Sequence, residues 1–363
     1  RLMRFAAAAA AAATAGRGRM TTIASYLEHG TPVVPWDTRG AAAVRRLAPA
    51  LSYRRHKGQA GRIGVLGGSV EYTGAPFYAA SSALRVGADL AWVFTAKDAA
   101  TAIKCYSPEL IVVPAYGEED VEETYVRTVR PWLDRLHGLV VGPGLGRDPA
   151  VLRGVARVLE VAARDLKLPV VVDADGLFLV AQQPALVAGC PNVLLTPNQV
   201  EYDRIKRKVL DDEHRHNSSG APSAVVEAKD LARLCRALGG VAIVKKGRTD
   251  LISDGDAVIA VDERTAPRRC GGLGDLLSGS AATLAVWAAE LPKDAFADDH
   301  NATNPLLWAA YGACVLARRA AASAFAAKRR ATLAPDVLAH LGDVFERMVP
   351  TVVFDDEDGD GDY

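Results

Sequence analysis

Residues 169–196 read PVVVDADGLFLVAQQPALVAGCPNVLLT and contain the pattern that decides the fold. Short apolar runs, VVV and VLL, stand near the two ends, and a helix-length stretch lies between them. Both runs are continuously hydrophobic rather than alternating, which indicates strands buried on both faces, and such strands are typical of parallel sheets. The stretch therefore predicts a strand–helix–strand unit of a parallel sheet.

The same alternation extends over most of the chain. Five further apolar runs are separated by amphipathic stretches long enough for helices: GRIGVLG at Gly61, LAWVF at Leu90, LIVV at Leu110, GLVVG at Gly138 and VAIVK at Val241. We predict an α/β fold with helices on both faces of a mostly parallel sheet. In DLISDGDAVIAV, Asp254 and Gly255 separate two apolar runs, which predicts a hairpin at one edge of the sheet.

Length and composition limit the classes of function. The 363 residues fit one large domain, which we place at residues 45–350, with an extension at each end. Lys plus Arg and Asp plus Glu are both 43, so no global field favours nucleic acid or acidic lipid. The five widely spaced cysteines predict a reducing compartment without structural zinc. No membrane partner is expected, and a homo-oligomer remains open.

The two ends differ from the body. Residues 1–40 form an extension whose first part is rich in Ala, carries Arg4, Arg17 and Arg19, and has no acid before Glu28. This composition resembles a mitochondrial presequence and predicts a mitochondrial protein. The alternative is low-complexity sequence upstream of a start at Met20, which would leave the protein in the cytoplasm. Residues 351–363 end in DDEDGDGDY and predict a disordered acidic tail.

The most informative loop is RRCGGLGDLLSG, residues 268–279, which leads into an apolar helical stretch. Its glycines allow close approach of the backbone to a ligand, and the helix start points unpaired N–H groups at it. We therefore predict an anion hole. Asp275 stands at the helix start, where we expect it to stay ionised at neutral pH and to deprotonate a hydroxyl beside the bound phosphate. The alternative is a helix N-cap.

Polar residues follow several other strands. Gly144 and Gly146 in GPGLG do not satisfy the dinucleotide fingerprint, and a tight turn explains them as well. Asn198 and Glu201 are spaced to share one helical face and to bind water-bridged Mg²⁺, although a capping box requires the same residues. Lys246 is placed to meet a nucleotide phosphate or to be merely solvated.

The polar or aromatic residues after two other strands each have two explanations. Asp173 and Asp175 in VVVDADG are explained by turn chemistry as readily as by catalysis. Tyr72, in the loop after the first strand, is available to stack on a ring, and the alternative is a buried aromatic side chain.

These motifs, in this order, resemble those of the ATP-dependent (S)-NAD(P)H-hydrate dehydratases of the ribokinase-like superfamily, from about Ser52 to Met348. The motifs that carry the resemblance are HKGQAGRIGVLGGSVEYTGAP, LRVGADLAWVF, YSPELIVVP, VVGPGLGRDP, PVVVDADGLFLVAQQPAL, LTPNQVEYDR and RRCGGLGDLLSG. The resemblance implies a three-layer α/β/α fold. It also implies ATP-dependent phosphorylation of the C6 hydroxyl of hydrated NADH and NADPH, followed by loss of phosphate. The Cys-Gly-Gly form of the last motif resembles the eukaryotic, ATP-using enzymes.

The resemblance also assigns residues. Asp275 matches the catalytic and substrate-contacting Asp. Substrate-binding positions are Gly144, Gly146, Asn198, Gln199, Val200, Glu201, Tyr202, Asp203 and Arg204. ATP-binding positions are Lys246, Gly247, Arg248, Thr249, Asp250, Thr265, Ala266, Pro267, Arg268, Arg269, Cys270, Gly271, Gly272, Leu273 and Gly274. Mg²⁺ is the implied metal, with Glu201 binding it through water.

One residue departs from the family pattern. Leu273 stands where the family commonly has Gln, so a polar side-chain contact is lost while the backbone N–H stays. Two alternatives therefore remain open: a small-molecule kinase of the same superfamily, and a nucleotide-binding protein without catalysis.

Overall fold

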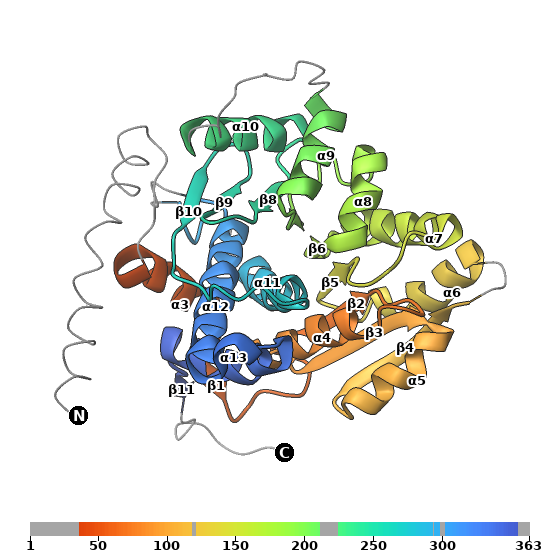
Figure 1. Ribbon diagram of the computed structural model, residues 1–363, viewed down its shortest axis with the longest axis horizontal. Helices are drawn as coiled ribbons and strands as arrows, with labels where there is room; N and C mark the ends of the chain where they lie inside the picture. The colour runs from red at the N-terminus through yellow and green to blue at the C-terminus, as the bar shows by residue number, and fades with distance from the viewer. Residues whose placement is uncertain (1–35, 118–120, 211–223, 293, 298–301, 355–363) are drawn as a thin grey trace.

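The computed structural model describes residues 36–117, 121–210, 224–292, 294–297 and 302–354. Its centre is a nine-stranded sheet with the order β10-β9-β8-β7-β6-β5-β2-β3-β4 (Figure 1). The strands are β2 (Arg62–Leu66), β3 (Leu90–Ala96), β4 (Leu110–Tyr116), β5 (Gly138–Val141), β6 (Val170–Val172), β7 (Val193–Leu195), β8 (Ala242–Lys245), β9 (Asp250–Ser253) and β10 (Val258–Val261). Each predicted apolar run is one of these strands.

The sheet is parallel except at one edge. Strands β2 to β8 pair in parallel, and β9 pairs antiparallel with both β8 and β10. Gly255 takes φ 104° in the turn between β9 and β10, a conformation that glycine adopts without strain. The predicted mixed sheet and edge hairpin are confirmed.

Helices cover both faces of the sheet, which makes the three layers that the sequence predicts. Figure 1 shows α4, α11, α12 and α13 grouped on one side of the sheet and α7, α8 and α9 on the other. The helices are α3 (Ala41–Leu47), α4 (Gly74–Val86), α5 (Lys97–Tyr106), α6 (Val121–Leu133), α7 (Pro149–Glu160), α8 (Ala174–Gln182), α9 (Gln199–Leu210), α10 (Ala224–Ala237), α11 (Leu273–Glu290), α12 (Pro305–Lys328) and α13 (Ala334–Met348). Short helical turns are η2 (Trp36–Gly40), η3 (Val161–Asp165), η4 (Pro184–Leu186) and η5 (Arg329–Ala331).

Helix α11 is buried along almost its whole length. Every residue from Leu276 to Ala288 is buried, so this helix is hydrophobic on all sides rather than on one. Its buried hydroxyls are satisfied: Ser280 donates to the Leu276 carbonyl of its own helix, and Thr283 donates to the Ala83 carbonyl of α4. The packing holds the N-terminal end of α11 rigidly at the carboxyl edge of the sheet.

The packed body extends beyond residues 45–350. Trp36 and Val44 are buried in the core, and a small parallel sheet joins β1 (Leu51–Ser52) to β11 (Val353–Phe354). Residues 1–35 of the predicted extension, residues 211–223 after α9 and the acidic tail from Asp355 lie outside the described residues. Among the described helices, none combines the length and the apolar character needed to cross a bilayer.

Candidate active site

The strand order reverses between β2 and β5, because the chain moves outward from β2 in one direction and from β5 in the other. Ligands of open α/β sheets bind at such a point, beyond the carboxyl ends of the strands. The loops that follow β2 and β5 are in close backbone contact here: the Gly68 N–H donates to the Pro143 carbonyl at 2.9 Å. A Cβ on Gly67 would lie 2.1 Å from the same oxygen, so only glycine fits.

The GPGLG loop after β5 lies at this point of the sheet. Its glycines and one carboxylate fix its shape. Gly144 takes φ 62°, and a Cβ there would lie 2.8 Å from the Tyr72 carbonyl. Asp175 accepts from the Gly146 N–H at 3.0 Å and from Arg147 Nε at 3.1 Å. Asp175 therefore fixes the loop rather than acting on a ligand. Tyr72 is 59% exposed, so the alternative of a buried aromatic side chain is wrong.

The second glycine loop leads into α11 as predicted. Gly272 precedes the helix with φ 92°, and apart from the adjoining residues no described atom lies within 4 Å of the position where a Cβ on Gly271 would stand. Asp275 is the third residue of α11, after Leu273 and Gly274, and no side chain caps this helix end. The N-cap alternative for Asp275 is therefore wrong, and Gly272 at the N-cap position has no side chain to occupy the N–H groups of the helix start.

The ionisation state of Asp275 differs from the sequence prediction. Burial, and then the nearby Asp173 carboxylate, raise the pKa of Asp275 to about 8, against the lowering effect of Lys246. The expectation that Asp275 stays ionised at neutral pH is wrong for the ligand-free enzyme, because desolvation exceeds the small favourable effect of the helix dipole. A carboxylate with a raised pKa is a stronger proton acceptor than an ordinary one.

Lys246 reaches the same place from β8. Its Nζ donates to Asp173 Oδ1 at 2.9 Å, and Asp173 is only 2% exposed. A Cβ on Gly274 would lie 3.5 Å from both Lys246 Nζ and Asp173 Oδ2, so the ion pair faces the glycine loop. Burial lowers the pKa of Lys246, but Asp173 outweighs it and the pKa is raised overall. Lys246 is thus a charged donor beside the loop, and Asp173 belongs to the site.

Asn198 and Glu201 form the predicted capping box, and Glu201 also faces the site. The Asn198 N–H donates to Glu201 Oε2 at 2.8 Å, and the Glu201 N–H donates to Asn198 Oδ1 at 3.0 Å. Burial raises the pKa of Glu201, although Asn198 and Lys246 lower it. Only one carboxylate oxygen is used by the cap, so Glu201 keeps a second oxygen for a ligand.

The remaining predicted substrate-binding residues, 199–204, lie partly in the core and partly on the surface of α9. Tyr202 is buried with its ring under Lys245, and Gln199 donates to Asp203 at 2.9 Å on the helix surface. Val200 is 67% exposed. Arg204 lies 5.5 Å from the centre of the Phe178 ring, and Arg147 lies 4.5 Å from it. Sequence reasoning did not single out Arg147 or Phe178; the two arginines give this side of the site positive charge.

A pocket of about 130 Å³ lies beside the glycine loop. The predicted ATP-binding residues that line it are Lys246, Gly247, Asp250, Thr265, Arg269, Leu273 and Gly274. Helix α12 adds Cys314, Ala317, Arg318 and Ala321, which sequence reasoning missed. Their spacing places them on one helical face, and that spacing is the signal that was available.

Some predicted ATP-binding residues serve the loop itself. Asp250 is buried, accepts from the Gly247 N–H at 2.9 Å and pairs with Arg318 at 2.6 Å. Thr249 donates to Asp262 at 3.2 Å. Ala266 is buried, and the Leu273 side chain packs partly against the core. These residues fix the shape of the pocket wall, to which Lys246, Gly247 and Gly274 also contribute.

Comparison with known proteins matches this geometry to one family. The family profile described as NAD(P)H-hydrate dehydratase matches residues 63–342. The chain belongs to this family. The human ATP-dependent (S)-NAD(P)H-hydrate dehydratase is 49% identical over 313 residues, which cover 85% of this chain and 84% of the human protein. The bovine enzyme of that name is 48% identical over 309 residues, covering 84% and 88%.

Solved structures agree on the fold. An ADP/ATP-dependent NAD(P)H-hydrate dehydratase from Bacillus subtilis, co-crystallised with ATP/Mg²⁺, superposes with a TM-score of 0.59 at 21% identity and covers 88% of this chain and 99% of its own. A Streptococcus mutans protein gives 0.63 at 21% identity, covering 87% and 99%. The ribokinase-like fold that the resemblance implied is confirmed.

Proposed function

We propose that this protein uses ATP to dehydrate (6S)-NADHX and (6S)-NADPHX, the hydrated forms of NADH and NADPH, and so returns them to use. The observation that carries the proposal is the position of Asp275, which stands in the first turn of α11 beside the Lys246–Asp173 pair and a loop of bare glycine N–H groups. This arrangement brings a proton acceptor, a fixed cation and anion-binding amides to one place. Phosphoryl transfer to a hydroxyl requires these three elements.

The chemistry divides into a transfer and an elimination. Asp275 takes the proton of the C6 hydroxyl while the terminal phosphoryl group of ATP moves to the hydroxyl oxygen, leaving ADP. The C–O bond then breaks, the electron pair departs with phosphate, and the ring nitrogen supplies electrons. Loss of a proton from C5 restores the ring double bond. Phosphate leaves readily where hydroxide would not, which is why ATP is consumed.

Lys246 and the glycine loop stabilise the charge of the transferred group. Gly271 and Gly272 present N–H groups at the start of α11, where the helix dipole favours an anion. Lys246 adds a full positive charge that Asp173 keeps in place. Leu273 leaves this backbone cradle intact, because only its side chain differs from the family pattern.

The donor set also fits Mg²⁺, which we include in the proposal. Mg²⁺ is usually held by one or two carboxylates together with phosphates and water. Glu201 has one oxygen outside its cap, and Asp173 has Oδ2 outside its bond to Lys246. These two residues would hold the ion, directly or through water, and the ion would neutralise the charge of the phosphates. The B. subtilis relative was crystallised with ATP/Mg²⁺.

The experiment is incubation of the protein with (6S)-NADHX, Mg²⁺ and ATP, followed by the absorbance of reduced nicotinamide. Reappearance of NADH with equal release of ADP and phosphate supports repair. A stable phosphorylated product would support a small-molecule kinase, and binding of ATP without turnover would support a non-catalytic nucleotide-binding protein.

Asp275→Asn tests the central residue. Turnover should fall by about 10²–10⁴-fold, the usual contribution of a general base, while ATP still binds. The variant should also be more stable than the wild type at pH 8. The wild-type pKa is higher in the folded than in the unfolded protein, so its stability falls as pH rises toward about 8, and Asn removes that loss. Unchanged turnover with intact folding would contradict the mechanism.

We also propose that residues 1–40 direct the protein to mitochondria, because the segment is rich in Ala, bears Arg4, Arg17 and Arg19, and has no acid before Glu28. A fluorescent reporter that carries residues 1–40 behind an initiator methionine should accumulate in mitochondria. A second reporter with Arg4, Arg17 and Arg19 changed to Gln should stay in the cytosol. A diffuse cytosolic signal from the first reporter would refute the proposal.

A further inference from the structure

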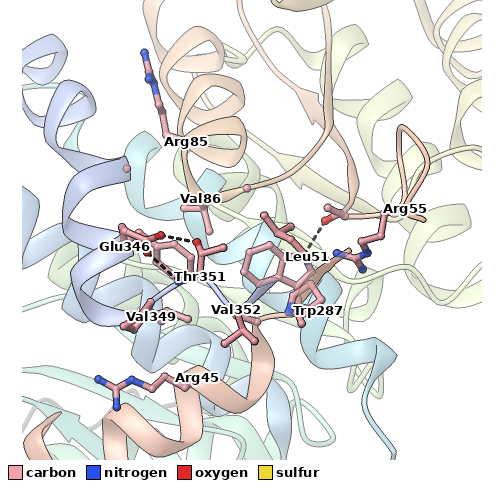
Figure 2. A pocket seen from close by; sticks show the side chains of 18 of the residues that line it. Arg45, Leu51, Arg55, Arg85, Val86, Trp287, Glu346, Val349, Thr351 and Val352 are labelled. Carbon is pink, nitrogen blue, oxygen red and sulfur yellow. Dashed lines mark hydrogen bonds between the residues drawn. The ribbon is translucent and has the colours of Figure 1, made fainter. Parts of the chain in front are cut away.

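A second and larger cavity lies near the far end of α11 from Asp275. It has a volume of about 460 Å³, within the usual range of small-molecule sites. Its walls come from α3, the segment around β1, the end of α4, α13 and the segment that leads to β11 (Figure 2). Trp287 lines it, twelve residues after Asp275, which is about 18 Å along the helix. The cavity is therefore separate from the candidate active site.

The floor of this cavity is apolar. Trp287 is 5% exposed, and its indole N–H donates to the Ala60 carbonyl at 2.7 Å, so the ring has no unsatisfied polar atom and presents a hydrocarbon surface. Val86 and Val349 are buried beside it. Such a surface favours an apolar molecule over water.

The charge on the walls is unbalanced. Three arginines and one carboxylate line the cavity. The carboxylate, Glu346, already accepts from the Thr351 N–H at 2.9 Å and from its hydroxyl at 2.6 Å. Figure 2 shows Arg85 pointing away from the cavity and Arg55 reaching toward Leu51 and Trp287.

One terminal nitrogen of Arg55 lacks an acceptor among the described residues. Its Nη1 is buried and makes no hydrogen bond within the described part of the chain. A buried charged donor without a partner is costly, so an acceptor is missing at this point. Arg45, on the opposite wall, uses Nε on the Met348 carbonyl at 3.1 Å. Its terminal nitrogens point away from the cavity in Figure 2, so Arg55 is the arginine that faces the apolar floor.

We infer that this cavity binds a small amphipathic organic anion, whose carboxylate or phosphate is held by Arg55 and whose apolar body lies on Trp287, Val86 and Val349. Charge complementarity selects an anion, because Glu346, the one carboxylate among the described lining residues, already accepts two hydrogen bonds from Thr351. The closed, apolar floor selects a hydrocarbon body over a fully polar ion. The inference is independent of the repair activity proposed above.

Decanoate is a suitable probe, compared with decylammonium, which has the same chain and the opposite charge. Isothermal titration of the full chain with saturating ATP, which occupies the other pocket, should show one saturable site for decanoate and none for decylammonium. Arg55→Gln should weaken decanoate binding by about tenfold or more, since hydrogen bonds to charged groups are the strong ones. Turnover should stay unchanged in this variant.

Two further variants keep the test decisive. Arg85→Gln removes the same charge from a side chain that points away, and should alter the affinity by less than about threefold. Gly342→Leu fills the cavity, and its Cβ would meet only the Arg85 carbonyl, at 3.8 Å, so the protein should fold and decanoate binding should be lost. Equal affinity for the two probes, or unchanged binding in Arg55→Gln, would overturn the inference. Decanoate binding that occurs only after deletion of residues 355–363 would also overturn it, in favour of the acidic tail as the occupant.

Discussion

Two ion pairs flank the β8–β9 turn, and they differ in how completely their cations are satisfied. Arg318 donates from Nε to Asp250, from Nη1 to the carbonyls of Arg248 and Glu263, and from Nη2 to the Gly247 carbonyl. The ammonium group of Lys246, four residues before Asp250, makes one hydrogen bond, to Asp173. An ammonium group has three donors, so two N–H bonds of Lys246 have no partner among the described residues.

The difference separates scaffold from chemistry. A guanidinium with four of its five N–H donors used by the protein has little left for a ligand, so Arg318 holds the 246–250 turn in shape. An ammonium held at one point, beside bare glycine amides, keeps donors for a phosphate. Residue type and burial alone do not show which ion pair is structural and which can bind a ligand. The number of unused N–H donors on the cation does.

The largest expected effect is on stability, from breaking the scaffold pair. Arg318→Met leaves Asp250 buried without its partner and should lower the free energy of unfolding by about 3–5 kcal/mol, measured by denaturant titration. Arg319→Met is the matched control: the neighbouring arginine pairs with Glu263 at 2.7 Å but is partly exposed, so its loss should cost about 1 kcal/mol or less. Equal costs in the two variants would contradict the distinction.

Breaking the second pair should act on catalysis. Lys246→Met removes the fixed cation beside the transferred phosphate and should lower kcat/KM for ATP by about 10²–10³-fold, the usual loss for one such donor. Lys245→Met is the control, because Lys245 is the adjacent lysine, pairs with Glu227 at 3.0 Å and lies against Tyr202. Its kcat/KM should stay within about threefold at a temperature where both variants are folded. A comparable loss in both would argue that the effect of Lys246 is structural.

The smallest expected change is a shift of the pH profile, which tests whether the Asp173 charge raises the pKa of the catalytic base. Burial raises the pKa of Asp275 to about 8, with the Asp173 charge as the next cause, so kcat/KM of the wild type should rise with pH and level off above about 8. Asp173→Asn removes a negative charge, which favours the ionised form of Asp275 and lowers its pKa. The rise should therefore move to lower pH by about one unit. A pH profile that does not move would remove Asp173 from the tuning of the base.

The fold was predictable because its signal is local. Strands such as β5 and β6 are buried on both faces, so each of them is continuously hydrophobic and can be recognised from its own residues. The edge hairpin followed from Asp254 and Gly255, which lie next to each other in the sequence. The β1–β11 sheet was missed because each strand has only two residues and its partner lies about 300 residues away, so neither end carries a recognisable pattern.

The candidate site was predictable where one motif contains all its parts. The glycine loop and Asp275 lie within seven residues, and the structure keeps them together as predicted. Asp173 stayed undecided because its partner, Lys246, is 73 residues away, and only the sheet order brings β6 and β8 to the same edge. The pKa of Asp275 was mispredicted for the same reason: burial and the Asp173 charge are properties of the assembled fold.

The pairing of β1 with β11 has a consequence for biosynthesis. Leu51 lies beside Val353, and Arg45 bonds the Met348 carbonyl across 303 residues of sequence. Contacts between such distant segments cannot form until nearly the whole chain has left the ribosome, and closing so long a loop is entropically unfavourable. The central sheet can assemble from its N-terminal strands during synthesis, but the cavity at Arg55 is completed only when the last strand arrives.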